Sequence, residues 1–248
     1  MKVQIVTEEG GWILPRWSKH WAKRLNATVN TRVRPGYDVN FYVNYGFYRG
    51  SQRGLDVCYF THREEKDPMR SRFDEVAKRC DWCVAQCKKT AEHLDPLKTS
   101  VIRPGVDDEF IRGDPLRIGV VGRDYHYTDR KRFHWVPMLR TEFPDIRFPM
   151  ASDLSLKDLR LFYEGIDYLL VTAKNEGGPM PVVEAISMGK PVIMPEGVGW
   201  CDEFFGIRYD SSYAGLCEVI RGLVFPSDQW DQSTKELSKL FVELLDGK

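Results

Sequence analysis

Two carboxylates that stand eight positions apart, Glu176 and Glu184, flank the segment of this chain best suited to binding a ligand. Pro181, between them, fits the first turn of a helix, where its missing N–H is not needed. Gly189 fits the left-handed residue just beyond the end of that helix. We therefore expect Glu176 in a loop and Glu184 in the first turns of the helix that follows it.

The glycines of the same segment add a second binding element. Gly177 and Gly178 lead directly into the expected helix. N–H groups at a helix start have no partner within the helix and lie at the positive end of its dipole, so they bind anions. The sequence therefore predicts a ligand that carries phosphate groups for the amides and hydroxyl groups for the two carboxylates.

Strand-like and helical runs that could position this segment alternate along the whole chain. In the first half we expect strands at 3–6, 27–33, 39–43, 55–60, 82–85 and 100–102, and helices at 15–25, 70–79 and 88–94. In the second half we expect strands at 117–121, 146–148, 167–171 and 191–194, and helices at 130–142, 155–163, 212–223 and 228–245. The alternation predicts an α/β fold with mostly parallel sheets. It restarts near residue 110, so a hinge between two domains is expected around residues 113–115.

The bulk composition is that of an ordinary soluble protein. The chain has 248 residues, 42% hydrophobic and 29% charged, which is enough for one large domain or two small ones. No apolar run approaches the roughly 20 residues that cross a bilayer. Residues 1–7 are too short in their apolar part for a signal peptide and are typical of a first strand. A cytoplasmic protein is expected.

The net charge of zero hides an asymmetry between the two halves. Residues 1–105 carry 19 Lys and Arg against 12 Asp and Glu, a net +7, whereas residues 106–248 carry 17 against 24, a net −7. The basic half is expected to face an acidic partner. Aromatic and cationic residues interleave in it at 12–25 and 42–49. They could stack on DNA bases, lie on an anionic membrane, or be core aromatics beside surface cations. The sequence leaves these three interpretations open.

The cysteine spacing gives little support to a metal site. Cys80 and Cys83 are spaced like half of a zinc site, and Cys87 lies near them. No second pair or histidines with a fitting spacing accompany them, so we expect buried free thiols and no metal.

The segment 175–193 resembles the Glu-x7-Glu signature of retaining glycosyltransferases of the GT-B fold, in particular family 4. Three further blocks resemble this family in the same order along the chain, namely 101–110, 118–123 with Lys131, and 161–171. The resemblance implies two Rossmann-like domains with parallel sheets that face each other across a cleft.

The resemblance also divides the chain by role. Residues 1–108 would form an N-terminal, acceptor-side domain, and residues 109–248 a C-terminal domain that binds the sugar-nucleotide donor. In the family a terminal helix crosses back to the first domain. The apolar stripe of the helix expected at 228–245 suits this placement, and packing on its own domain is the alternative.

In this family the negative charge that grows on the leaving phosphate is balanced without a metal ion. The resemblance implies that Arg123 and Lys131 balance this charge here. The chain contains no Asp-x-Asp triplet of the kind that metal-using glycosyltransferases carry. Lys131 lies farther from Arg123 than is usual in the family, so Arg130 or Arg132 could take its place.

The remaining roles follow from the same resemblance. Glu176 would bind hydroxyls of the sugar, Glu184 would bind the ribose hydroxyls, and His62 would lie near the reacting sugar. The donor-binding residues that it implies are Gly10, Gly11, Arg123, Lys131, Glu176, Gly177, Gly178, Pro179, Met180 and Glu184. The catalytic residues that it implies are Glu176, His62, Arg123 and Lys131.

The sequence thus predicts a retaining, metal-independent glycosyltransferase that needs no cofactor and uses a nucleotide sugar such as a UDP- or GDP-sugar as donor. The acceptor is expected to be anionic: a glycan, a lipid headgroup or a modified base in DNA. Peripheral contact with a membrane is compatible with this prediction. The alternative is a module on the same fold that binds nucleotide sugars without catalysis. A related phosphorylase would need a phosphate or pyridoxal site, and no lysine context indicates one.

Overall fold

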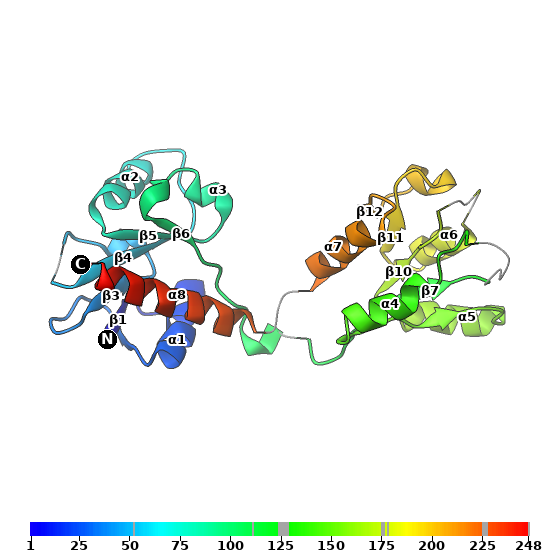
Figure 1. Cartoon of the computed structure of the whole chain (residues 1–248), viewed down its shortest axis with the longest axis horizontal. Helices are drawn as coiled ribbons and strands as arrows, with labels where there is room; N and C mark the ends of the chain where they lie inside the picture. The colour runs from blue at the N-terminus through cyan, green and yellow to red at the C-terminus, as the bar shows by residue number, and fades with distance from the viewer. Residues whose placement is uncertain are drawn as a thin grey trace. The chain divides into compact units, whose positions relative to one another are not determined.

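The structure is a computed structural model that describes residues 1–51, 53–110, 112–123, 129–174, 177, 179–224 and 228–247. The chain divides into two compact units (Figure 1). Unit 1 comprises Met1–Ile111 and Pro226–Lys248, and unit 2 comprises Arg112–Phe225. The chain first passes from unit 1 to unit 2 after residue 111, three residues beyond the expected domain boundary at 108. The segment Pro226–Lys248, which was expected to continue the domain 109–248 or to cross back, belongs to unit 1.

Unit 1 is built on a six-stranded parallel sheet with the strand order β2-β1-β3-β4-β5-β6. Its strands are β1 Val3–Val6, β2 Thr28–Asn30, β3 Val39–Tyr42, β4 Leu55–Phe60, β5 Trp82–Ala85 and β6 Thr99–Val101. The three strands β1, β3 and β4 are buried along their full length. Burial on both faces is what parallel sheets covered by helices require, and it explains the continuous apolar runs in the sequence.

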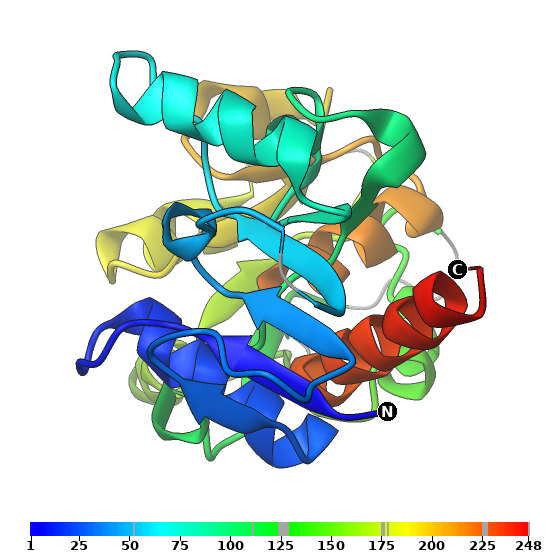
Figure 2. The same cartoon turned by 90° about the vertical axis from the view of Figure 1, so that its left-hand side faces the viewer.

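Helices cover both faces of the unit 1 sheet (Figures 1 and 2). One face packs against α1 Ile13–Leu25 and α8 Gln229–Asp246, and the other against α2 Met69–Arg79 and the short α3 Lys88–Ala91. Short 3₁₀ turns complete the unit at η1 Tyr45–Phe47, η2 Pro96–Lys98 and η3 Asp108–Phe110.

The C-terminal helix α8 packs against α1 and closes the core of unit 1. The Trp21 indole N–H donates to the Ser233 hydroxyl at 2.7 Å, and the Trp21 and Trp230 rings meet edge to face with centroids 5.5 Å apart. Phe241 reaches Phe41 of the central strand β3 in the same geometry at 5.7 Å. Of the two placements that the sequence allowed for this helix, the structure has the one on unit 1.

Both helices also fix the segment that leaves the sheet after β6. The Trp230 indole N–H donates to the Val106 carbonyl at 2.9 Å, and Gly105 lies close to the same indole, because a methyl group added to it would overlap the ring. The buried carboxylate of Asp107 pairs with Arg16 and with His20, both on α1. Contacts with α1 and α8 therefore hold residues 105–107, within the block 101–110, on unit 1 just before the chain enters unit 2.

Unit 2 has its own parallel sheet, with the strand order β12-β11-β10-β7-β8 and with β9 also paired to β7. Its strands are β7 Leu116–Val121, β8 Ile146–Arg147, β9 Met150–Ala151, β10 Tyr168–Leu170, β11 Val192–Pro195 and β12 Ile207–Tyr209. The single strand expected at 146–148 is two short ones, because the partner of β7 is interrupted at residues 148 and 149.

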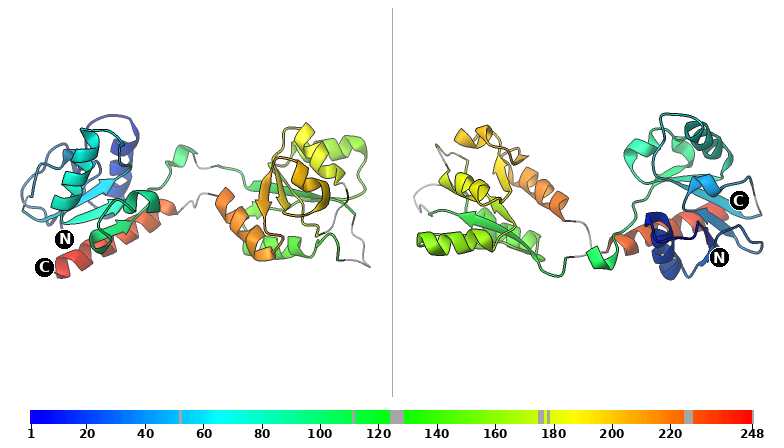
Figure 3. Two further views of the ribbon diagram at one scale, coloured as in Figure 1. Left: turned by 90° about the horizontal axis from the view of Figure 1, so that it is seen from above. Right: turned by 180° about the vertical axis from the view of Figure 1, so that it is seen from behind.

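Four helices cover the unit 2 sheet in two layers (Figure 3). One face packs against α4 Trp135–Glu142 and α7 Tyr213–Leu223, and the other against α5 Leu156–Glu164 and α6 Met180–Ser187. The 3₁₀ turn η4 Gly199–Glu203 follows β11. Serines cap two of the helices, since the Ser155 and Ser212 hydroxyls accept N–H groups of their first turns at 3.2 and 2.9 Å.

Two Rossmann-like α/β units with parallel sheets confirm the predicted fold class. The helix expected at 130–142 begins only at Trp135. The carbonyls of Arg130 and Lys131 accept from Lys174 and Thr172 after β10, and Arg132 has a left-handed φ of 51° that no helix contains. None of the helices in the described ranges combines the length and the apolar character needed to cross a membrane.

Most aromatic residues of the interleaved runs belong to the core. Trp17 and Trp21 are buried against β3 and β4, and Tyr42, Tyr45 and Tyr48 are buried on the opposite face of the sheet. These side chains cannot stack on bases or enter a membrane, which corrects that interpretation for them. Within these runs Trp12 is 51% exposed and Phe47 is half-buried. The thiols of Cys58, Cys80 and Cys83 are free and buried in the core beside α2.

We predict that Gly105→Ala destabilises the protein by about 1–3 kcal/mol, because the added methyl group overlaps the buried indole of Trp230. Gly113→Ala is the matched control, since nothing lies within 4 Å of its added methyl group. Urea unfolding of the whole chain measures both changes. Equal stability of the two variants would contradict the contact between Gly105 and Trp230.

Candidate functional site

The order of the strands in unit 2 marks one place on its sheet as a ligand site. From β7 the chain runs first to β8 on one side and then returns to β10 on the other. Helices therefore leave the neighbouring strands β7 and β10 toward opposite faces, and a crevice opens at their carboxyl ends. Open α/β sheets bind ligands at such a switch point.

Gly122 and Lys131 meet at this point. Gly122 follows β7 directly and has a φ of 150°, a conformation that favours glycine. A methyl group on Gly122 would lie 3.8 Å from Nζ of Lys131, so the ammonium group lies beside the backbone at the end of β7. The glycine of the Gly-Arg motif thus lies beside the lysine that stands eight residues after its arginine.

Backbone bonds fix the position of Lys131. The Thr172 hydroxyl donates to the Lys131 carbonyl, and the Lys174 N–H donates to the Arg130 carbonyl at 2.9 Å. Both donors follow β10, so the loop that carries Lys131 lies across the carboxyl end of that strand. Arg132 turns elsewhere: its guanidinium donates to the Ser211 carbonyl at 2.6 Å and lies over the Trp135 ring. Lys131 is therefore better placed than Arg132 to be the cation expected near the diphosphate.

Arg123 is 70% exposed and pairs with Asp153, the residue that follows β9 and Ser152. Hydrogen bonds from Ser152 and from Arg123 lower the pKa of the Asp153 carboxyl, which keeps it charged at neutral pH. The ion pair holds Arg123 on the β9 side of β7. A ligand that binds the Arg123 guanidinium must compete with the Asp153 carboxylate for it.

Glu184 lies in the middle of α6, and Tyr163 of α5 holds one of its oxygens. The Tyr163 hydroxyl donates to Oε2 of Glu184 at 2.7 Å. Burial, and then the neighbouring carboxylate, raise the pKa of Tyr163, so its hydroxyl stays protonated and donates. A carboxylate accepts several hydrogen bonds, and the half-buried Glu184 retains capacity for ligand hydroxyls.

The start of α6 lies at the same crevice as Lys131. Pro179 caps the helix and lines the crevice together with Lys131 and Thr172, while Met180, the first helical residue, is exposed. The enclosed space measures about 20 Å³, which is room for about one water molecule, so a nucleotide would have to lie along its rim. Gly177 is exposed. Glu176 and Gly178 lie outside the described residues.

Gly10 and Gly11 lie in unit 1, in the loop that joins β1 to α1. Gly10 has a φ of 145°, and nothing lies within 4 Å of a methyl group placed on Gly11. The same loop holds two polar atoms, the Thr7 hydroxyl and Oε2 of Glu8, that are buried without a hydrogen-bond partner among the described residues. Buried polar atoms seldom remain unpaired, so we regard this loop as a candidate ligand-binding segment.

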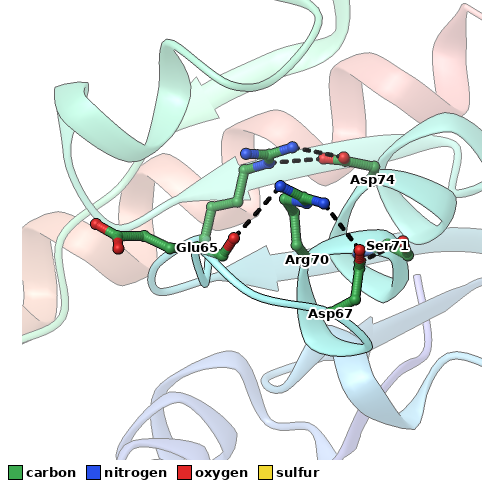
Figure 4. Close-up of polar contacts among 6 residues, drawn as sticks. Glu65, Asp67, Arg70, Ser71 and Asp74 are labelled. Atoms are coloured by element: carbon green, nitrogen blue, oxygen red, sulfur yellow. Dashed lines mark hydrogen bonds and ion pairs between the residues drawn. The ribbon is translucent and has the colours of Figure 1, made fainter.

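His62 also lies in unit 1, after the end of β4, and is 69% exposed. One ring nitrogen contacts the Thr61 hydroxyl at 3.0 Å and the other contacts the Glu64 carboxylate at 2.9 Å. A network on α2 braces the loop that follows (Figure 4). Arg63 makes a bidentate pair with Asp74 at 2.8 and 2.6 Å.

Arg70 and Ser71 complete that network. Both donate to the Asp67 carboxylate, at 2.8 and 2.5 Å, and Arg70 also reaches the Glu65 carbonyl (Figure 4). The loop after His62 is thus tied to the first turns of α2 at several points. His62 itself is held only by its neighbours in sequence, so its ring is accessible on a braced loop.

The predicted site residues therefore divide between the units. Gly10, Gly11 and His62 lie in unit 1, and Arg123, Lys131, Gly177, Pro179, Met180 and Glu184 lie in unit 2. Sequence reasoning missed Tyr163, Asp153 and Thr172. Tyr163 lies within the block 161–171, where the apolar pattern predicts a helix and a strand. That pattern cannot predict that its hydroxyl bonds to Glu184, 21 residues later.

Comparisons with known proteins give similar folds only at low similarity. The sequence matches no family model, and no curated protein matches it. The lipopolysaccharide outer core galactosyltransferase WaaB in its apo form is similar at 14% identity and a TM-score of 0.34, over 94% of this chain and 79% of that one. A glycosyltransferase from Rickettsia africae ESF-5 is similar at 11% identity and a TM-score of 0.37, over 99% and 98%.

The GtfA/B complex is similar at 14% identity and a TM-score of 0.33, over 84% of this chain. The chain spans 57% of that protein's length. Similarities of this size add nothing to what the strand orders themselves establish.

We predict that Tyr163 and Glu184 stabilise each other by about 1.5–3 kcal/mol, as a hydrogen bond to a charged group does. A double-mutant cycle of Tyr163→Phe with Glu184→Ala in urea unfolding measures this coupling. The control cycle pairs Tyr163→Phe with Glu164→Ala, because Glu164 bonds to Arg160 instead. Strict additivity in the first cycle would show that the contact contributes nothing.

Proposed function

We propose that this chain is a retaining, metal-independent glycosyltransferase and that unit 2 binds its nucleotide-sugar donor. One observation carries the proposal. Lys131 and Pro179, at the start of α6, line one crevice at the switch point of the unit 2 sheet, so a cation lies beside the first turn of a helix where such sheets bind ligands.

The chemistry assigned to these groups is the neutralisation of a leaving phosphate. Negative charge grows on the diphosphate as the sugar–phosphate bond breaks, and fixed positive groups stabilise it. The Lys131 ammonium lies at the end of β7 with its backbone bonded to the β10 segment, so little reorganisation is needed. The amides of Gly177, Gly178 and Met180 would hold the distal phosphate, and Glu184 would accept the ribose hydroxyls.

Retention of configuration follows a front-face route in this proposal. The bond from the sugar's anomeric carbon to the phosphate oxygen breaks, and the acceptor oxygen bonds to the same carbon from the same side. The acceptor's hydroxyl proton passes to the leaving phosphate oxygen, so no nucleophile from the protein is needed. Glu176 would hold the sugar hydroxyls, and unit 1 would bind an anionic acceptor through the loops that carry Gly10, Gly11 and His62.

We predict that nucleotides and nucleotide sugars raise the melting temperature of the protein, and that Lys131→Ala or Glu184→Ala abolishes this shift. The screen includes UDP-, GDP- and ADP-sugars and contains EDTA, since the proposal requires no metal. Lys157→Ala and Glu218→Ala are the matched controls, because both side chains lie exposed on other helices of unit 2. A shift that survives in both site variants would refute the assigned site.

Turnover separates a transferase from a module that only binds. Slow release of free nucleotide from the stabilising nucleotide sugar, lost in Lys131→Ala, is the expected result. Binding without any release or transfer over a panel of acceptors would leave a non-catalytic nucleotide-sugar-binding module.

We predict that Asp153→Asn tightens nucleotide-diphosphate binding about 2- to 5-fold, because Arg123 no longer has to leave a carboxylate before it binds phosphate. Titration calorimetry at low salt measures the change. The control is Asp158→Asn, whose carboxylate accepts from Ser155 and not from an arginine. Weaker binding in Asp153→Asn would mean that the pair positions Arg123 for the ligand rather than competing with it.

A further inference from the structure

Unit 1 carries a cavity of about 430 Å³ at the carboxyl ends of β1, β2 and β3. The chain passes from β1 to β2 on one side and then to β3 on the other, so this is the switch point of the unit 1 sheet. Val6 and Tyr42, the last residues of β1 and β3, line the cavity. It therefore occupies the position at which an open parallel sheet binds a ligand, and its volume lies in the range of small-molecule sites.

Part of the wall of this cavity is apolar. Val33 and Phe47 line it from the loop after β2 and from η1, on the face of the sheet that packs against α2. Tyr42 is fully buried and its hydroxyl donates to the buried Asp56 carboxylate at 3.2 Å, so it offers a ligand no free polar group. The lining suits an aromatic or aliphatic group.

Two guanidinium groups give the cavity its charge. Arg32 lies in the loop after β2 and is exposed, and no hydrogen bond or ion pair joins its side chain to any residue that the structure describes. Arg49 follows η1 and also lines the cavity, and one of its nitrogens donates to the Gly46 carbonyl at 2.5 Å, which fixes its direction. Among the described residues, those that line this cavity include no carboxylate. Arg32 and Arg49 are thus the charged side chains of the described lining.

From this arrangement we infer that the cavity, which we call the basic cavity, binds a phosphate monoester carried on an aromatic or apolar group. A phosphate offers three terminal oxygens, so it can accept from two guanidinium groups at once, whereas a carboxylate offers two. The inference rests on the proposed function in one respect: it makes this phosphorylated compound the acceptor of the sugar. The anion site itself stands on the cavity alone.

Arginine labelling of the wild-type chain tests the inference directly. Phenylglyoxal modifies accessible arginines, and mass spectrometry reads each position with and without phenyl phosphate. We expect phenyl phosphate to slow modification of Arg32 and Arg49 by at least about threefold and to leave Arg34 and Arg53 unchanged. Arg34 is the matched control because it lies two residues from Arg32 outside the cavity lining. Equal protection of Arg34, or none of Arg32 and Arg49, would overturn the inference.

Two further probes test the ligand class. Phenol, which lacks the anion, should give no protection. Benzoate should protect less than phenyl phosphate, and stronger protection by benzoate would overturn the assignment of a phosphate.

Binding measurements separate this inference from the proposed function. Replacing both Arg32 and Arg49 by alanine should weaken phenyl phosphate binding about tenfold or more, while Arg34→Ala should not change it. The same double variant should keep the thermal shift by nucleotides that Lys131→Ala abolishes. If phenyl phosphate protects Arg32 and Arg49 but no nucleotide stabilises the protein, the proposed function fails and the anion site stands. If nucleotides stabilise the protein and the double variant binds phenyl phosphate normally, the anion site fails alone.

Discussion

Parallel hydrogen bonding within each sheet is the constraint from which the rest of this protein follows. All strands of a parallel sheet run in one direction, so all their carboxyl ends, and the loops that leave them, gather at one edge. In both units the chain also reverses its direction of travel across the sheet, between β1 and β3 in unit 1 and between β7 and β10 in unit 2. The candidate site and the basic cavity lie at these two reversals.

The sequence predicted the fold well because its signals are long and repeated. Alternating apolar strands and amphipathic helices identify two parallel α/β units without any knowledge of contacts. The errors occur where a tertiary bond replaces a local one. The segment before Trp135 has a helical composition, yet its carbonyls accept from Thr172 and Lys174 beyond β10, and the helix starts later.

The site could be predicted only in part, for a related reason. Spacing could not decide which of the three consecutive cations at 130–132 belongs to it, because the choice depends on an acceptor at Ser211. Nor could spacing show that Arg123 is paired with Asp153, or that Glu184 is held by Tyr163. Such pairs join residues 21 to 79 positions apart, and nothing in the local pattern marks either partner. The aromatic runs of unit 1 show the converse, since residues that suggest a binding surface fill the core instead.

The return of α8 to unit 1 has a consequence for how the protein is made. Unit 2 is continuous in sequence, so a ribosome synthesises all of it before α8. Unit 1 therefore receives Trp230 and Phe241, two large members of its core, only after unit 2 has been synthesised. Until α8 is synthesised, the Trp21 and Phe41 rings of the nascent chain lack the aromatic partners that later cover them. A product truncated before α8 would expose this aromatic surface to chaperones and proteases.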